Sequence, residues 1–318
     1  MSISFLKNLV LMLFLSSFIR TKPIVAIYGN PYPEEDYEKN SGDSINGAYV
    51  RWLESFGAEI VAIHQWYTVE EIDALLSKVN GVLYQGGDRI FNFTAKWEQN
   101  GKHILEYAQK TGLPLWATCL GFELVCDLIA GEQILEVFND STNIHGAIMT
   151  DTSTTCKMYS QFTTKDFDTF VNGQSTIYNH IFGVSEEKFM QYESLTSLFD
   201  ITSFALDKDG KKFVNSIESK VGNIFATQYH PEKNPYIRRN YILEHGVDSL
   251  RISQKIGMSF MKEVMKNKNW MNYEDRMKYD FITTYEKPPK ETYDTANNTY
   301  YYQKKETVNI SIIDLYLK

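Results

Sequence analysis

The chain has 318 residues, of which 43% are apolar and 23% are charged, and its net charge is −8. This balance is typical of a globular protein with a sizeable core, built as one large or two small domains. The negative charge and the lack of a basic stripe in the sequence exclude a nucleic-acid partner.

The first twenty residues differ from the rest of the chain. Lys7 precedes the apolar run LVLMLFL at 9–15, and the small residues Ser16 and Ser17 follow it. This order predicts a secretory signal peptide at 1–20, because the apolar run is too short to span a bilayer. A buried N-terminal helix is the alternative. We therefore expect an extracellular, lysosomal or vacuolar protein that has no membrane segment once the signal is removed.

Two further features bear on export and on metals. Four Asn-x-Ser/Thr sequons are candidate glycosylation sites: Asn92, Asn139, Asn297 and Asn309. The three cysteines are too few, and odd in number, for a disulfide framework. No CxxC pair or His-x₃-His cluster occurs, so the sequence contains no zinc pattern and we expect no metal site.

From residue 24 onward, short apolar runs alternate with helical patterns. Strands are predicted at 24–29, 59–64, 82–87 and 113–118, and helices at 43–57, 68–81, 96–111 and 120–131. Strands that are apolar throughout are typical of a parallel sheet covered on both faces. The predicted fold class is therefore α/β, with three layers and a mostly parallel central sheet between helices.

The second half of the chain is less regular. Residues 133–220 predict short extra strands and loops, followed by a strand at 223–230 and a helix at 247–266. We predict one hydrolase-sized domain at 22–270 and a C-terminal extension at 271–318, rich in Tyr and Lys, that packs on the same domain. The extension ends in the strand-like VNISIIDLYL.

Cys119 follows a predicted parallel strand and precedes a predicted helix, in the stretch LWATCLGFEL. Ligands bind at this edge of open α/β sheets, and a sharp turn there exposes a nucleophile. The helix N-terminus stabilises a thiolate, and the Leu120 N–H is placed to donate to a developing oxyanion. A buried structural cysteine remains the alternative on these residues alone.

A cysteine nucleophile needs a base, and His230 in QYHPEK follows a predicted strand. Pro231 restricts His230 to extended backbone, so Glu232 lies on the same side and can orient the imidazole. A surface turn is the alternative for this motif.

The double glycine at 86–87 ends a third predicted strand at the same edge of the sheet. Its backbone can turn N–H groups toward a ligand, although Gly-Gly can also mark a simple turn. Because three such features meet at one edge, a nucleophile explains Cys119 better than passive burial does.

The motifs YQGG, LWATCLGFEL and QYHPEK, in this order, resemble the class I glutamine amidotransferase-like fold and, more specifically, the γ-glutamyl hydrolase family. The resemblance spans about residues 22–266 and is poor at 133–210. It implies that Cys119 is the nucleophile, His230 the general base and Glu232 its orienting carboxylate. It also implies that Gly87 and Leu120 supply the oxyanion hole.

The resemblance implies cleavage of folylpoly-γ-glutamates, and of antifolate polyglutamates, through a thioester and without a cofactor. The substrate is then a small molecule, pteroyl-poly-γ-glutamate. The substrate-binding residues stay unknown, because the family's additional substrate-side histidine has no clear counterpart at 133–210. One departure is Ala117, where the family's Gly-x-Cys-x-Gly turn begins with glycine; it puts the geometry of the turn in question.

Two other functions remain open on the sequence. A glutaminase subunit that feeds ammonia to a synthase would share Cys119, His230 and Glu232. Synthases of that type work in the cytosol, so the predicted signal peptide argues against this function. A non-catalytic secreted binding or storage protein could keep the same fold. The sequence leaves the oligomeric state open, with a homodimer among the states that it allows.

Overall fold

The first strand already separates the two halves of the core. In β1 (Ile24–Tyr28), Ala26 and Tyr28 pack into one hydrophobic cluster, whereas Val25 and Ile27 pack into another. Successive side chains of a strand point to opposite faces, so a strand that is apolar throughout must be covered on both sides.

The computed structural model describes residues 22–32, 42–173, 175–236, 245–282, 293–294 and 299–303. The predicted signal peptide, the sequons at Asn297 and Asn309 and the strand-like end of the chain lie outside these residues.

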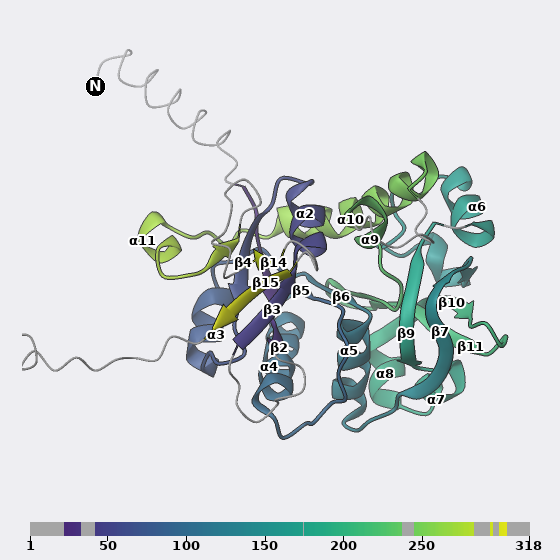
Figure 1. Cartoon of the computed structure of the whole chain (residues 1–318), viewed down its shortest axis with the longest axis horizontal. Helices are drawn as coiled ribbons and strands as arrows, with labels where there is room; N and C mark the ends of the chain where they lie inside the picture. Colours follow the sequence, from purple (N-terminus) through teal and green to yellow (C-terminus); the bar gives the residue numbers. More distant parts are fainter. Residues whose placement is uncertain are drawn as a thin grey trace, which may run out of the picture.

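A nine-stranded mixed sheet forms the centre of the described part of the chain (Figure 1). Its order is β13 (Phe281–Ile282), β4 (Glu59–Ile63), β1, β5 (Gly81–Tyr84), β6 (Leu115–Thr118), β12 (Ile224–Thr227), β11 (Lys212–Ser219), β10 (Phe199–Leu206) and β8 (Ile148–Met149). Strands β4 to β12 in this order are parallel, and the outer strands are antiparallel. The predicted α/β class with a mostly parallel central sheet is confirmed.

Two smaller sheets lie beside the central one. The first has the order β14 (Tyr293–Asp294), β15 (Thr299–Gln303), β3 (Gly42–Asn46) and β2 (Asn30–Tyr32). The second is an antiparallel ribbon of β7 (Glu136–Ile144) and β9 (Ile177–Gly183), whose register shifts twice. The ribbon touches the central sheet region where Ile177 bridges His230.

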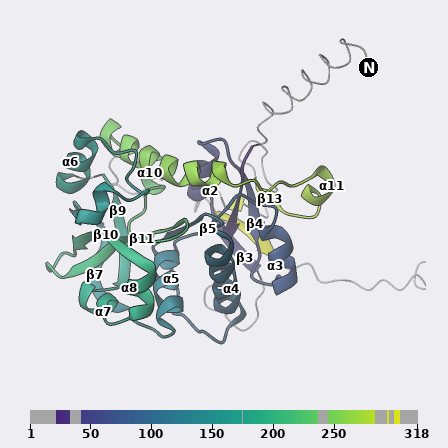
Figure 2. The same cartoon turned by 180° about the vertical axis from the view of Figure 1, so that it is seen from behind.

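Helices cover both faces of the central sheet, as the two opposite views show (Figures 1 and 2). Helices α2 (Gly47–Glu54) and α10 (Val247–Lys266) pack on one face, and α3 (Val69–Leu76), α4 (Lys96–Thr111) and α5 (Leu120–Ala130) pack on the other. The remaining helices are η1 (Asp151–Thr154), α6 (Thr164–Asn172), α7 (Glu186–Met190), α8 (Glu193–Leu198), α9 (Lys233–Tyr236) and α11 (Tyr273–Arg276). No helix in the described ranges is long and apolar enough to cross a membrane.

Local signals explain several helix ends. Thr68 and Glu71 form a capping box at the start of α3, with both reciprocal hydrogen bonds present. Gly131 ends α5 with a φ of 80°, the left-handed conformation that glycine adopts without strain.

Three sequence-based predictions about elements were wrong. The helix expected from residue 43 begins at Gly47 with Asn46 as its N-cap, because Gly42–Asn46 pairs as a strand with β15. The helix expected to reach residue 81 ends at Leu76, since Gly81 already belongs to β5. Finally, the region at 133–220 contains α6, α7 and α8 as well as strands.

The described part of the C-terminal extension pairs with two strands of the main body. Phe281 and Ile282 of β13 pair with β4, and β15 pairs with β3. The domain boundaries at 270 and 271 stay a prediction.

Candidate active site

Cys119 lies in the turn between β6 and α5, with φ 53° and ψ −110°. Among the described residues it is the only one other than glycine with a positive φ. Its N–H donates to Thr227 O of the neighbouring strand at 2.7 Å, which fixes the start of the turn. Strained backbone of this kind is concentrated at functional sites.

Gly121 allows this turn to form. A Cβ atom at Gly121 would lie 2.6 Å from the Tyr84 carbonyl oxygen, in the adjacent strand β5. Ala117 lies before the turn and is buried in β6, opposite Ala226 and Tyr84. Its methyl group belongs to the core, and the turn forms with alanine at this position.

His230 and Glu232 form a buried pair after β12. His230 Nδ1 lies 2.8 Å from Glu232 Oε1, so Nδ1 carries the proton and donates to the carboxylate. The other ring nitrogen, Nε2, has no hydrogen-bond partner among the described residues. Burial lowers the pKa of His230 to about 4, and Lys233 reinforces this effect while Glu232 opposes it. The ring is therefore neutral at physiological pH, with an Nε2 lone pair that can accept a proton.

The thiol of Cys119 is also neutral. Burial and then the Glu123 carboxylate raise the pKa of the Cys119 thiol well above its usual range, although a hydrogen bond from the Leu120 N–H opposes this. The Leu120 N–H thus has the expected stabilising effect on a thiolate, but desolvation of the buried sulfur outweighs it. Cys119 and His230 are therefore both neutral, and the Cys119 thiol lies 4.0 Å from the Asn179 carbonyl oxygen.

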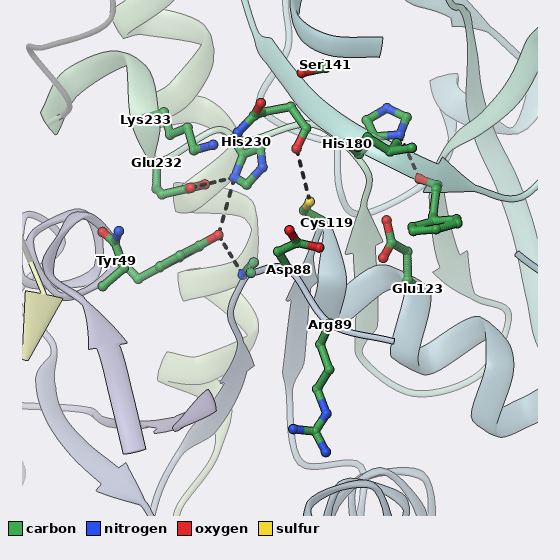
Figure 3. Close-up of a pocket in the computed structure, with 16 residues that line it drawn as sticks. Tyr49, Asp88, Arg89, Cys119, Glu123, Ser141, His180, His230, Glu232 and Lys233 are labelled. Carbon is green, nitrogen blue, oxygen red and sulfur yellow. Dashed lines mark hydrogen bonds and ion pairs between the residues drawn. The ribbon is translucent and has the colours of Figure 1, made fainter. Parts of the chain in front are cut away.

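Gly86 lies close to both Cys119 and His230. A Cβ atom at Gly86 would lie 2.8 Å from His230 Cε1 and 3.3 Å from Cys119 Cβ. The His230 ring and the Cys119 side chain therefore both border the space that a Cβ atom at Gly86 would fill. Figure 3 shows Cys119 and His230 side by side, with Glu232 on the far side of the imidazole.

Gly86 is also held by two side chains. Its N–H donates to the Tyr49 hydroxyl at 2.8 Å, and its carbonyl oxygen accepts from Asn30 Nδ2 at 3.0 Å. The Tyr49 hydroxyl lies 3.4 Å from His230 Nδ1, so this tyrosine contacts both the double glycine and the imidazole. Gly87 follows, and its N–H makes no hydrogen bond within the described residues.

These side chains surround a cavity of about 410 Å³ (Figure 3). The walls come from the ends of β5 and β6, the start of α5, the ribbon β7–β9 and the segment at 230–233. The lining residues are Asn46, Tyr49, Gly86, Gly87, Asp88, Arg89, Cys119, Glu123, Ser141, Asn179, His180, Ile181, Phe182, His230, Glu232 and Lys233.

Among the lining residues that sequence reasoning missed, four bear on the chemistry of the site. Glu123 lies one helical turn after Cys119, a spacing that could have identified it. Burial raises its pKa to about 8, and it accepts a hydrogen bond from Gln228 Nε2 at 2.9 Å. Tyr49 was predicted only as part of the apolar face of its helix, and Lys233 directly follows the predicted Glu232.

His180 is the fourth missed residue, and it comes from the region where no substrate-side histidine was identified. It lies in β9 with its Nδ1 2.7 Å from the Phe182 carbonyl oxygen. Its Nε2 faces the buried Asp140 carboxylate at 3.4 Å. The irregular register of the β7–β9 ribbon explains why no period-2 pattern pointed to this histidine.

Two of the predicted glycosylation positions lie within the described residues, and both are exposed. Asn92 Oδ1 accepts hydrogen bonds from the N–H and hydroxyl of Thr94, and Asn139 Nδ2 donates to Asp209. Neither lies in the wall of the cavity. Their modification stays a prediction.

Comparison with known proteins agrees with this geometry. Residues 39–250 match the family described as glutamine amidotransferase class-I. The glutaminase domain of Trypanosoma brucei CTPS has a similar structure, with a TM-score of 0.53 at 13% identity, over 78% of this chain and 95% of that one. The chain belongs to the class I glutamine amidotransferase family.

γ-Glutamyl hydrolases are among the curated proteins whose sequences are similar to this chain. γ-Glutamyl hydrolase B of Dictyostelium discoideum is 27% identical over 84% of this chain and 79% of the relative. Probable γ-glutamyl hydrolase 3 of Arabidopsis thaliana is 28% identical over 76% of this chain and 70% of the relative. The predicted resemblance to the γ-glutamyl hydrolases is confirmed.

Proposed function

We infer that this protein hydrolyses γ-glutamyl amide bonds, with Cys119 as nucleophile and His230 as general base. One observation carries this proposal: the buried Nε2 of His230 has no partner among the described residues, and His230 and Cys119 both border the space beside Gly86. Glu232 holds the opposite nitrogen, so the free lone pair is directed to the cavity side.

The first half of the reaction forms a thioester. Nε2 of His230 removes the thiol proton while Sγ of Cys119 attacks the γ-carbonyl carbon of the substrate. The carbonyl oxygen becomes an oxyanion, which the N–H groups of Gly87 and Leu120 stabilise. The C–N bond then breaks, and the imidazolium returns its proton to the departing amine.

The second half consumes water. The leaving amine vacates its place, and a water molecule gives one proton to Nε2 of His230 as its oxygen attacks the thioester carbon. The C–S bond breaks, the free γ-carboxylic acid forms, and the proton on Nε2 returns to the sulfur of Cys119. Glu232 stabilises the imidazolium in both halves because a buried positive charge needs a paired carboxylate.

We propose pteroyl-poly-γ-glutamate as the substrate. Such a chain carries one α-carboxylate per glutamate, and the ammonium group of Lys233 is a cation in the cavity wall that can bind one of them. The raised pKa of about 8 keeps Glu123 largely protonated at neutral pH, so its carboxyl group does not repel the anionic chain. The names of the relatives favour hydrolysis over a glutaminase subunit.

Export is the remaining part of the proposal. A signal peptide at 1–20 would direct the protein to the secretory pathway, where Asn92 and Asn139 are accessible to glycosylation. An extracellular, lysosomal or vacuolar location fits the low pKa of His230, which keeps the base neutral in mildly acidic surroundings. A homodimer stays a prediction that light scattering of the purified protein would test.

The function is tested by incubation with pteroyl-pentaglutamate and separation of the products by chain length. We expect shorter pteroyl-glutamates from the wild type and from Cys126→Ala, a matched control whose thiol is buried on α5 outside the cavity. Cys119→Ala should give no products while its melting temperature stays close to that of the wild type. Release of ammonia from free glutamine without cleavage of the polyglutamate would instead identify a glutaminase.

A further inference from the structure

Asn30 contacts the predicted oxyanion donor from outside the cavity. It lies in β2, far from Cys119 in the sequence, and it is not one of the residues that line the cavity. Its Nδ2 donates to the Gly86 carbonyl oxygen at 3.0 Å. A Cβ atom at Gly87 would lie 2.5 Å from the same Nδ2, so the amide of Asn30 packs directly against the double glycine.

The planarity of the peptide bond gives this contact a consequence for Gly87. The Gly86 carbonyl and the Gly87 N–H belong to one peptide unit, and in a trans peptide they point in opposite directions. The Gly86 carbonyl oxygen faces Asn30, a residue that does not line the cavity. The N–H of Gly87, which makes no hydrogen bond within the described residues, is thereby turned toward the cavity side.

The preceding peptide unit is fixed as well. The Gly86 N–H donates to the Tyr49 hydroxyl at 2.8 Å, so it is already occupied and cannot serve a substrate oxyanion. Two consecutive glycines have no Cβ atoms to restrain their backbone, and a flip of the peptide between them would present a carbonyl oxygen to the substrate. Only the hydrogen bond from Asn30 holds this second peptide among the contacts described.

We propose that Asn30 is a positioning residue that locks the Gly86–Gly87 peptide with the Gly87 N–H facing the reacting carbonyl. This inference rests on the proposed function, because it assumes that an oxyanion forms at Cys119. Asn30 does not touch the substrate. It sets the orientation of a group that does.

Two variants separate the hydrogen bond from the shape of the side chain. Asn30→Leu keeps the size but removes the donor, and Asn30→Asp places an oxygen against the Gly86 carbonyl, which favours the flipped peptide. Ser44→Ala is the matched control, because the Ser44 hydroxyl donates to the backbone oxygen of Asn30 at 3.4 Å but does not touch the double glycine. Loss of one oxyanion donor lowers kcat about 10²- to 10³-fold, so its misorientation should cost about 10- to 100-fold.

Three readouts are measured on the full chain: kcat and KM for pteroyl-pentaglutamate, the affinity for a γ-glutamyl aldehyde, and the rate of Cys119 alkylation by iodoacetamide. The aldehyde forms a tetrahedral adduct with an oxyanion, whereas alkylation needs the thiolate but no oxyanion hole. For Asn30→Leu we expect kcat and aldehyde affinity to fall together, by about 10- to 100-fold. KM and the alkylation rate should stay within about threefold of the wild type, and Asn30→Asp should be more severely impaired.

Other outcomes contradict the proposal. Wild-type kcat in both Asn30 variants would show that the Gly86–Gly87 peptide keeps its orientation without the hydrogen bond from Asn30. A fall in kcat that is matched by slower alkylation and a lower melting temperature would show a merely structural role. If the wild type cleaves no γ-glutamyl amide, the proposed function fails and this inference fails with it, whereas an active wild type with unaffected variants contradicts this inference alone.

Discussion

Nδ1 of His230 lies 2.8 Å from Oε1 of Glu232, and both side chains are almost completely buried. The contact assigns the proton of the neutral ring to Nδ1 and leaves Nε2 as the acceptor. A buried carboxylate next to the base also compensates the positive charge that the ring acquires during turnover.

Glu232→Gln tests this relationship, because it keeps the size of the side chain and removes its charge. We expect kcat to fall about 10²- to 10⁴-fold, since the amide can hold the wrong tautomer and does not stabilise the imidazolium. The fall should appear in steady-state kinetics on pteroyl-pentaglutamate, with little change in KM. A variant that retains more than half of the wild-type kcat would contradict the role of Glu232.

The pH dependence of activity follows from the buried imidazole. Burial lowers the pKa of His230 to about 4, so the base stays neutral down to that pH. We expect the acidic limb of kcat/KM to have its midpoint near pH 4, measured in buffers of constant ionic strength between pH 3 and 8. A midpoint between pH 6 and 7 would mean that the ring titrates as in water.

The lowered pKa of His230 also makes the stability of the folded protein depend on pH. The pKa of His230 in the folded protein lies below its unfolded value of about 6.5, so the unfolded chain binds more protons between these two pH values. The contribution of His230 to stability is fully present above about pH 6.5 and is lost as the pH falls through about 4. Thermal melts of the wild type and of His230→Gln should therefore differ in their slope against pH within this window.

Much of the fold could be predicted from the sequence because its signals are local. Apolar runs marked β1, β4, β5 and β6, and the helical pattern at 120–131 marked α5. The start of α2 could not be predicted in this way. Residues 42–46 form a strand because they pair with β2 and with β15, which lies some 250 residues further on.

The residues of the candidate site also fall into two groups: some could be predicted from local sequence signals, and others could not. Cys119, His230, Glu232 and Gly87 follow strand ends, and parallel strands bring their ends together at one edge, so sequence order was enough to group them. His180 comes from a ribbon with an irregular register, and its approach to the cavity depends on tertiary contacts. The direction of the Cys119 pKa was also missed, because burial of a turn residue is not visible in the sequence.

Gly121→Ala should disrupt the turn that carries the nucleophile. The added methyl group would lie 2.6 Å from the carbonyl oxygen of Tyr84, a backbone atom that cannot rotate away. We expect a loss of about 1–3 kcal/mol in the free energy of unfolding and a lower kcat, measured by urea denaturation and kinetics. Gly112→Ala is the control: its φ of 73° costs stability, but it ends α4 with open space around it, so kcat should not change.

Ala117→Gly tests the one departure from the family's turn. Ala117 is buried in β6, and its methyl group packs in the core before the turn begins. Removing this methyl group and adding a flexible residue to a strand should cost about 1–2 kcal/mol of stability. The kcat should stay within about threefold of the wild type; a large gain in kcat would instead show that alanine distorts the turn.

The central claim, that Cys119 forms a γ-glutamyl thioester, is tested most directly by acid quenching during turnover of pteroyl-pentaglutamate, followed by mass spectrometry of the peptide that contains residue 119. The account predicts a transient acyl adduct on Cys119 in the wild type, and neither adduct nor hydrolysis in Cys119→Ala. Continued hydrolysis by Cys119→Ala, or wild-type turnover in which the adduct lies on another residue, would contradict it.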